Sequence, residues 1–451
     1  MKRTFGLTFF VLLMLALAAC GGGGTAPEPA ADEPAAPASS STDSGDAAAE
    51  TDSAAAETGG AETIVIGYTA SQTGSQNVSS TRQVNGLNLW MEQVNSMGGI
   101  ELSDGTKVTF AAVTYDDESN TDRVQELYTR LATEDNADFL ISPYSSGLTA
   151  ASAVIAEQYS KVMITTGAAS DDTYKQGLTT VFQAYTPASR YLTGAIDLLA
   201  TVDPSVKKVA FVYENDKFST DVVEAAKAYA EEKGYEVVLH EGYDTGTTDF
   251  GPFINKIQDA GPDAILGGGH FQDGSTFARQ LNEKNIDAKF FTLLVAPPEP
   301  DFADLGDAAI GVIGPSQWEP LAAYTPDSAI EAGLDWYGIL GDEFVTAYEA
   351  AYDGEEPSYH SAGGYAAGLI LEKAIRDADS IDPDAVKQAL DNMDLLTFFG
   401  HIKFDTTEEA HGLQIGHSMV YIQWQEGADG LGKQVVWPLE GATAETLYPL
   451  P

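Results

Sequence analysis

The stretch IVIGYTASQTGSQNVSSTRQVNGLNLWMEQVNSMGG (64–99) decides the fold class, because it predicts a strand, a loop and a helix in succession. The apolar run IVIGYT (64–69) is typical of a short buried strand. After a polar loop, apolar residues recur at helical spacing until Gly98-Gly99 ends the helix. The next apolar run, VTFAAVTY (108–115), predicts a second strand, so the segment forms a β-α-β unit.

The same alternation continues along most of the chain. Before Tyr185 the pattern predicts strands at 137–141 and 162–166 and helices at 124–134 and 148–159. After Tyr185 it predicts strands at 206–213, 236–240, 263–269 and 288–294 and helices at 220–234, 252–261 and 275–285. Repeated β-α-β units predict parallel sheets with helices on both faces and ligands beyond the carboxyl ends of the strands. Two such halves predict two similar lobes with a cleft between them.

The N-terminus predicts export. Lys2 and Arg3 precede an uncharged apolar run (5–18), which is shorter than the about 20 residues of a membrane-spanning helix. The only cysteine of the chain, Cys20, follows directly in LAAC, which resembles the lipobox of bacterial lipoproteins. Residues 1–19 are therefore predicted to be a lipoprotein signal peptide, with a lipid on Cys20. The alternative is an ordinary secretory signal with an incidental cysteine.

A low-complexity segment follows the cysteine. Residues 21–62 contain no Leu, Ile, Val or aromatic residue, so they lack the apolar side chains that a folded core needs. We expect residues 20–62 to form a disordered acidic tether. Its nine acidic residues leave 21 basic and 59 acidic residues, a net charge of −38, on residues 63–451. The acidity therefore belongs mainly to the folded surface, where it favours solubility.

Composition also argues against several classes of function. A net charge of −45 argues against nucleic-acid binding, since a phosphate polymer would be repelled. A single cysteine excludes an intramolecular disulfide framework and any multi-cysteine zinc site. The six histidines form no HxxxH pair, and the GxSxG motif of hydrolases is absent. We therefore expect no metal, no cofactor and no enzymatic activity.

Several stretches occur in the order seen in a known family. They are IVIGYTASQTG, NLWMEQVNSMGGI, VTYDDESN, SPYSSGLTAA, VMITTGAAS and, much later, HIKFD (401–405). The chain from about 63 to 425 resembles a type I periplasmic binding protein of the branched-chain amino-acid receptor group, which delivers ligands to ABC importers. This resemblance implies an α/β fold of two Rossmann-like, doubly wound parallel-sheet lobes joined by three crossover strands.

The resemblance also implies where the chain passes between the lobes. The crossovers are expected near Tyr185–Pro187, Gly314–Pro320 and Leu396–Gly400. The N-terminal lobe would comprise residues 63–185 plus 318–396, and the C-terminal lobe residues 188–313 plus 400–451.

The resemblance implies that the ligand's carboxylate is held at a helix start in the first lobe. Ser145 and Ser146 would offer hydroxyls and backbone amides at the start of the helix after strand 137–141. The alternative for these serines is ordinary helix capping. By family resemblance, Ala168 would contribute backbone contacts and Ser170 a hydroxyl.

Four further residues complete the expected ligand site. By resemblance Asp273 would accept the ligand's ammonium group, and its alternative role is an N-cap of the next helix. Phe218 would cover the ligand, and Tyr144 and Trp318 would line the cleft. All three aromatic residues have the alternative of packing in the core.

The sequence thus predicts an extracytoplasmic substrate-binding lipoprotein of an ABC importer. Its ligand would be an amino acid, branched-chain or a related small zwitterion. Its partners would be the ABC permease subunits and the membrane, through the lipid anchor, and the protein would be a monomer. The alternatives are a ligand-sensing receptor subunit, a binding protein for an amide, urea or aromatic acid, and an extracellular hydrolase.

Overall fold

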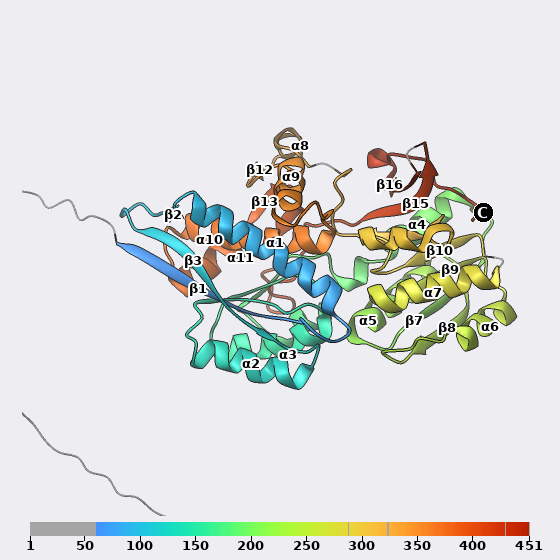
Figure 1. Cartoon of the computed structure of the whole chain (residues 1–451), viewed down its shortest axis with the longest axis horizontal. Coiled ribbons are helices and arrows are strands. Elements are labelled where there is room, and N and C mark those ends of the chain that lie inside the picture. The colour runs from blue at the N-terminus through green and yellow to red at the C-terminus, as the bar shows by residue number, and fades with distance from the viewer. Residues whose placement is uncertain (1–59, 287, 323, 429, 451) are drawn as a thin grey trace, which may run out of the picture. The chain divides into compact units, whose positions relative to one another are not determined.

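The computed structural model describes residues 60–286, 288–322, 324–428 and 430–450 (Figure 1). The predicted signal peptide, Cys20 and the tether as far as residue 59 lie outside the described residues. The first strand begins at Ala61, just inside the segment expected to be tether. No helix among the described ranges combines the length and the apolar composition needed to cross a bilayer.

The first lobe is built on a six-stranded sheet with strand order β2-β3-β1-β4-β5-β6. All neighbouring strands are parallel except the short β2, which runs antiparallel to β3. The strands are β1 (Ala61–Ala70), β2 (Ile100–Glu101), β3 (Lys107–Asp116), β4 (Phe139–Ile141), β5 (Met163–Thr165) and β6 (Val181–Gln183). This sheet confirms the strands expected at 64–69, 108–115, 137–141 and 162–166.

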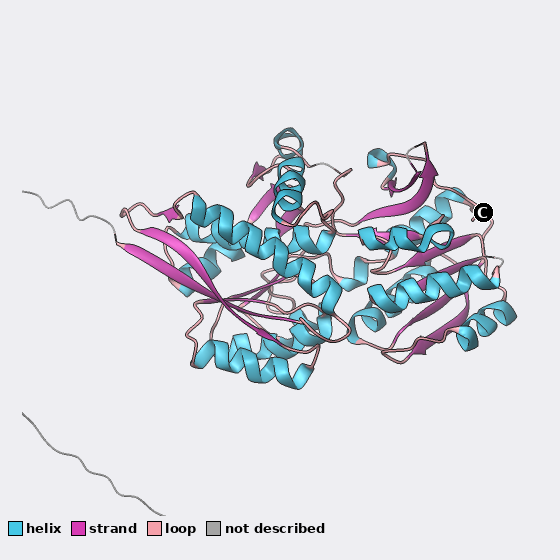
Figure 2. Cartoon of the chain, in the orientation of Figure 1, coloured by secondary structure: helices cyan, strands magenta, loops and turns pink. Residues whose placement is uncertain are grey.

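Helices cover both faces of this sheet, which gives the lobe two separate apolar cores (Figure 2). Helices α2 (Thr121–Thr133) and α3 (Ser146–Gln158) cover one face, and α1 (Asn77–Ser96) and α10 (Tyr359–Ala378) cover the other. Glycines allow α1 and α10 to approach closely. A Cβ on Gly86 would lie 1.8 Å from the carbonyl oxygen of Ser361, and one on Gly364 would lie 1.9 Å from that of Gln83.

The rest of the first lobe comes from the late part of the chain. Its helices are α8 (Pro326–Ala332), α9 (Gly341–Ala351) and α11 (Pro383–Asp391). A small sheet of order β12-β13-β14 combines β12 (Asp335–Trp336), β13 (Asp394–Thr397) and β14 (Gly400–Lys403). Its buried residues join the same core as α1 and α10, so segments distant in sequence form one lobe.

The second lobe has a seven-stranded mixed sheet of order β16-β15-β11-β10-β9-β7-β8. The strands are β7 (Lys208–Glu214), β8 (Glu236–Tyr243), β9 (Ala264–Gly268), β10 (Phe290–Leu293), β11 (Ile313–Ser316), β15 (Val420–Gly427) and β16 (Gly430–Trp437). The first five are parallel, and four of them follow the predicted strands, whereas β15 and β16 pair antiparallel.

Two helices cover each face of the second sheet. One core contains side chains of α4 (Thr193–Val202) and α5 (Lys217–Glu232), and the other contains side chains of α6 (Gly251–Ala260) and α7 (Phe271–Lys284). Helices α5 and α7 begin before their predicted starts at 220 and 275. The reason is capping: the side chain of Asp216 accepts hydrogen bonds at the start of α5, and α7 begins with a capping box formed by His270 and Asp273.

One expected boundary between the lobes is wrong. The resemblance places residues 400–417 in the C-terminal lobe, but they pack with the first. β14 pairs with β13, and the side chains of Ile402 and Phe404 are buried in the core of α1 and α10. The backbone N–H of Gln183 also donates to the carbonyl of Gly412. The chain therefore crosses to the second lobe between His417 and β15, because apolar residues after Gly400 complete the first core.

Candidate functional site

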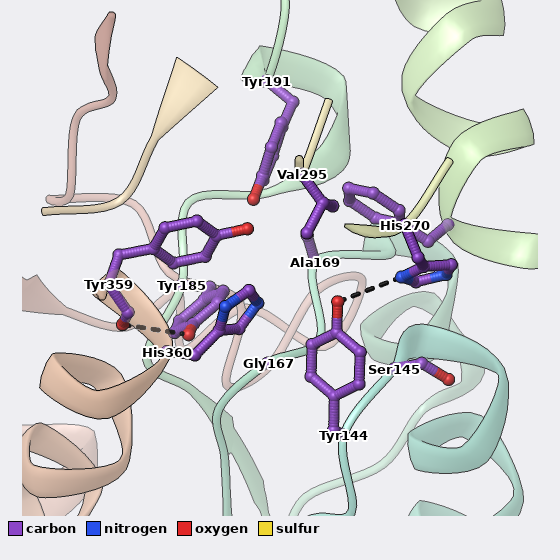
Figure 3. A pocket seen from close by; sticks show the side chains of 11 residues that line it. Tyr144, Ser145, Gly167, Ala169, Tyr185, Tyr191, His270, Val295, Tyr359 and His360 are labelled. Carbon is purple, nitrogen blue, oxygen red and sulfur yellow. Dashed lines mark hydrogen bonds between the residues drawn. The ribbon is translucent and has the colours of Figure 1, made fainter. Parts of the chain in front are cut away.

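The carboxyl ends of the central strands of the two sheets face each other across a small cavity (Figure 3). The first lobe contributes Tyr144, Ser145, Gly167, Ala169, Tyr185, Tyr359 and His360, and the second contributes Tyr191, Phe218, His270 and Val295. The cavity measures about 10 Å³, which is room for about one water molecule. The two lobes are therefore closed on each other, and a larger ligand would be enclosed with the lobes slightly further apart.

The start of α3, where the sequence predicts a ligand contact at Ser145, forms one wall. Ser145 is the N-cap, has a positive φ of 90° and lines the cavity. The neighbouring Ser146 makes different contacts. Its hydroxyl oxygen accepts hydrogen bonds from the backbone N–H groups of Ala169 (3.0 Å) and Ser170 (3.1 Å). Ser146 thus holds the segment after β5 against the helix that carries Ser145.

The segment after β5 lies at the cavity, but the residues that line it differ from those predicted. Gly167 and Ala169 line it, whereas the predicted Ala168 does not and accepts a hydrogen bond from the Gln183 side chain through its carbonyl. The hydroxyl of Ser170 donates to Asp221 of α5. Ser170 therefore connects the two lobes beside the cavity.

The expected aromatic residues divide between cavity and core. Tyr144 and Phe218 line the cavity, and Phe218 packs edge-on against Tyr191, with ring centroids 5.1 Å apart. Trp318, expected to line the cleft, is instead 2 % exposed in the first core, against the rings of Phe344 and Phe398. Trp318 therefore takes its alternative role of packing in the core.

Asp273 does not line this cavity. It is the third residue of α7, and its carboxylate accepts hydrogen bonds from the backbone N–H of His270 (2.8 Å) and from the hydroxyl of Tyr243. Asp273 thus helps to cap α7 from inside its first turn, whereas the N-cap residue itself is His270. The carboxylate faces a second cavity, described below, rather than the one lined by Tyr144.

His270 is a cavity residue that the sequence motifs did not indicate. Its Nδ1 lies 3.0 Å from the hydroxyl oxygen of Tyr144 in the other lobe, and its Nε2 lies 3.1 Å from Asp216 Oδ2. Burial by itself would lower the pKa of His270, but the hydrogen bond to Asp216 and the nearby carboxylates raise that pKa to about 9. A cationic imidazole therefore stands in the cavity wall. The available signal was its position at the end of a predicted strand, three residues before Asp273.

A buried ion pair also joins the lobes. Glu299 follows β10 in the second lobe, yet its side chain is fully buried against Arg82 of α1 and His360 of α10. Arg82 Nε lies 3.2 Å from Glu299 Oε2. Burial would raise the pKa of Glu299, but the positive charges of its neighbours hold it below its usual range. Nothing in the local sequence around residue 299 indicated this contact.

Comparison with known proteins agrees with this architecture. A family described as periplasmic binding protein matches residues 63–429. The Leu/Ile/Val-binding protein homolog 7 of Brucella suis is 26 % identical over 364 residues, covering 76 % of this chain and 84 % of the relative. Homolog 8 of Brucella abortus is 23 % identical over 380 residues, covering 79 % of this chain and 86 % of that one.

Solved structures share the fold. The branched-chain amino-acid transporter substrate-binding protein LivJ of Streptococcus pneumoniae, in complex with isoleucine, matches with a TM-score of 0.67 and 21 % identity, covering 83 % of this chain and 99 % of its own. A solute-binding protein of an ABC transporter from R. palustris, in complex with benzoate, matches with a TM-score of 0.66 and 19 % identity, covering 86 % and 98 %. The chain therefore belongs to the periplasmic binding protein family, whose members bind solutes and are not enzymes, and it has the type I fold of the branched-chain amino-acid receptors.

Proposed function

We propose that this protein is the extracytoplasmic substrate-binding lipoprotein of an ABC importer and binds an amino acid, branched-chain or a related small zwitterion, between its lobes. The observation that carries the proposal is the cavity at the carboxyl ends of both sheets, with walls from both lobes. A ligand held there touches both lobes at once, so it stabilises the closed form relative to the open one. The permease would then recognise the closed form and receive the ligand.

The lining favours a ligand with a carboxylate. The first turn of α3 presents the positive end of the helix dipole beside Ser145, and cationic His270 stands across the cavity. Tyrosine hydroxyls from Tyr144, Tyr185 and Tyr191 add hydrogen-bonding groups close by. Once the lobes part, these groups are free to bind an anionic oxygen.

A second candidate ligand is an aromatic acid. Five of the lining residues are Tyr or Phe, so their rings offer a planar apolar ligand stacking and edge contacts. The R. palustris protein in complex with benzoate has the same fold, which is consistent with this alternative.

A thermal-shift and calorimetry panel tests the proposal and separates the two ligand classes. The panel contains branched-chain and other amino acids, short amides, urea, and benzoate with related aromatic acids. We expect one class to raise the melting temperature and to bind with one ligand per chain. Phe218→Ala should weaken binding, whereas Phe253→Ala, on α6 away from the cavity, should not. If no compound stabilises the protein, the solute class is wrong.

The anchor needs its own test. In cells, the wild-type chain should incorporate labelled palmitate and sediment with the membrane, and Cys20→Ser should do neither. Equal membrane retention of the two proteins would contradict the lipid anchor and leave the solute-binding proposal untouched.

A further inference from the structure

A second cavity, of about 150 Å³, lies where the two lobes meet beside His270. The first lobe contributes Ser75 and Gln76, which precede α1, and the second lobe contributes Glu214, His270 and Asp273 among others. Glu214 ends β7, and His270 follows the neighbouring parallel strand β9. The acidic wall therefore stands at the carboxyl edge of the sheet, where parallel α/β sheets hold their ligands.

Three side chains converge beside this cavity. Glu214, Asp216 and His270 each offer one ligand atom, and these atoms all lie within 4.8 Å of one another. His270 Nε2 and Asp216 Oδ2 are 3.1 Å apart, close to the about 3–3.5 Å between ligand atoms that share one zinc ion. Asp216 uses its other oxygen, Oδ1, to accept from the backbone N–H of Ser219. Within the helix cap, Oδ2 accepts the longer bond, from the backbone N–H of Phe218 (3.4 Å), so an ion at Oδ2 would leave the shorter bond in place.

A buried acceptor in the cluster lacks a partner. Glu214 is 4 % exposed, and among the described residues its Oε2 finds no hydrogen-bond donor. The missing side chain of Gly269 leaves the necessary space: a Cβ there would lie 2.5 Å from both Glu214 Oε2 and Asp273 Oδ2. An unpaired buried carboxylate oxygen is costly, and a cation would remove that cost. Across the cavity, Gln76 Oε1 is also buried and, within the described ranges, without a partner.

We propose that Glu214, Asp216 and His270 bind a divalent first-row transition-metal ion such as Zn²⁺ at the meeting of the two lobes. One imidazole nitrogen with carboxylate oxygens is a donor set suited to zinc rather than to calcium or magnesium, which prefer oxygen ligands alone. The hydroxyl of Tyr144 lies against His270 Nδ1 and orients the ring so that Nε2 faces the cluster.

The site would couple the metal to the arrangement of the lobes. Tyr144 and Gln76 belong to the first lobe, whereas all three metal ligands belong to the second. A bound ion would therefore hold the second-lobe wall in the position that meets Tyr144. The lack of an HxxxH pair does not exclude this site, because its ligands come from two segments more than 50 residues apart. The ion would replace the proton on His270 Nε2, so the positive charge at the cavity wall would then come from the ion. This proposal does not depend on the identity of the solute.

Calorimetric titration of the chelator-stripped protein with Zn²⁺, without any solute, tests the site. We expect about one ion per chain, and we expect Glu214→Gln and Asp216→Asn each to lower the affinity at least tenfold. Asp216→Asn keeps a side chain that caps α5, so it should fold normally. Glu126→Gln, an exposed acid on α2, is the matched control and should leave binding unchanged.

Spectroscopy with Co²⁺ as the probe distinguishes this site from loose binding to the acidic surface. Visible absorption bands of a low-coordinate, nitrogen-containing site should saturate at one equivalent and disappear in His270→Gln. Absence of saturable Zn²⁺ binding, binding that all three ligand variants retain, or equal competition by Ca²⁺ would each overturn the proposal.

Discussion

Replacement of Glu299 by Gln should shift the protein from its closed toward its open form. Glu299 is fully buried, accepts from His360 and lies 3.2 Å from Arg82 Nε, although its two partners belong to the other lobe. Glutamine has nearly the same shape but no charge, so Arg82 would lose the carboxylate that is buried with it. Opening of the lobes relieves this loss because it returns Arg82 to water.

The size of the effect follows from the remaining partners. Removal of one member of a buried ion pair costs about 3–5 kcal/mol. Arg82 keeps Asp301 (3.0 Å) and Glu355 (3.3 Å), which are both partly exposed, so we expect about 2–3 kcal/mol. Since 1.4 kcal/mol corresponds to a factor of ten, the population of the closed form relative to the open form should fall about 30- to 150-fold.

Small-angle X-ray scattering measures the open fraction directly, and calorimetry measures the affinity for the solute found in the panel. Glu299→Gln should increase the radius of gyration without solute and weaken solute binding. The control is Glu134→Gln: Glu134 pairs with Arg130 at 3.6 Å on the surface, where such a pair contributes about 0.5 kcal/mol or less. If Glu299→Gln leaves scattering and affinity unchanged while its urea midpoint falls, the pair stabilises the fold rather than the closed form, and the reasoning is refuted.

Three single contacts give further predictions. Tyr144→Phe removes the hydroxyl that meets His270 and should weaken solute binding about 3- to 10-fold. Tyr159→Phe, beyond the other end of α3, should leave solute binding unchanged, and equal effects of the two variants would contradict a specific contact. Burial lowers the pKa of His417 to about 4 against 6.5 in an unfolded chain, so between these pH values the unfolded chain binds more protons and acid lowers stability. In urea unfolding, the free energy of unfolding of His417→Gln should therefore change less between these pH values than that of the wild type, by up to about 3 kcal/mol. An unchanged pH dependence would exclude His417 as its source. Gly86→Ala should lower the free energy of unfolding by about 3 kcal/mol or more, because its Cβ would lie 1.8 Å from the carbonyl oxygen of Ser361. A loss below about 1 kcal/mol in the same assay would show that α1 and α10 can move apart at little cost.

The elements of the two sheets could be predicted because their signals are local. An apolar run such as 64–69 and a helical stripe before Gly98-Gly99 each depend on residues within one or two turns of one another. The same locality explains why segment 400–417 was expected in the wrong lobe. Its apolar residues Ile402 and Phe404 predict burial equally well in either lobe, and only the space left in the first core decides between them.

The candidate site was predictable in its position and only partly in its members. Tyr144, Ser145 and Phe218 were expected at the cavity and line it, since each sits at a strand end or a helix start. Trp318 was expected there and lies in the core. Asp273 was expected at the cavity instead of His270, because a carboxylate suits an ammonium group. The direction in which these two side chains point depends on where α7 begins, which the sequence pattern placed too late.

By itself, the sequence determined the α/β class, the two-lobed organisation and the strand ends that carry the site, because periodicity and capping act over a few residues. It also predicted export and lipid attachment through Cys20, which lies outside the described residues. Only the tertiary structure decided which groups meet across the lobes: Glu299 with Arg82, and Tyr144 with His270. Such contacts depend on the packing of segments far apart in sequence, and no local pattern encodes the distance between them.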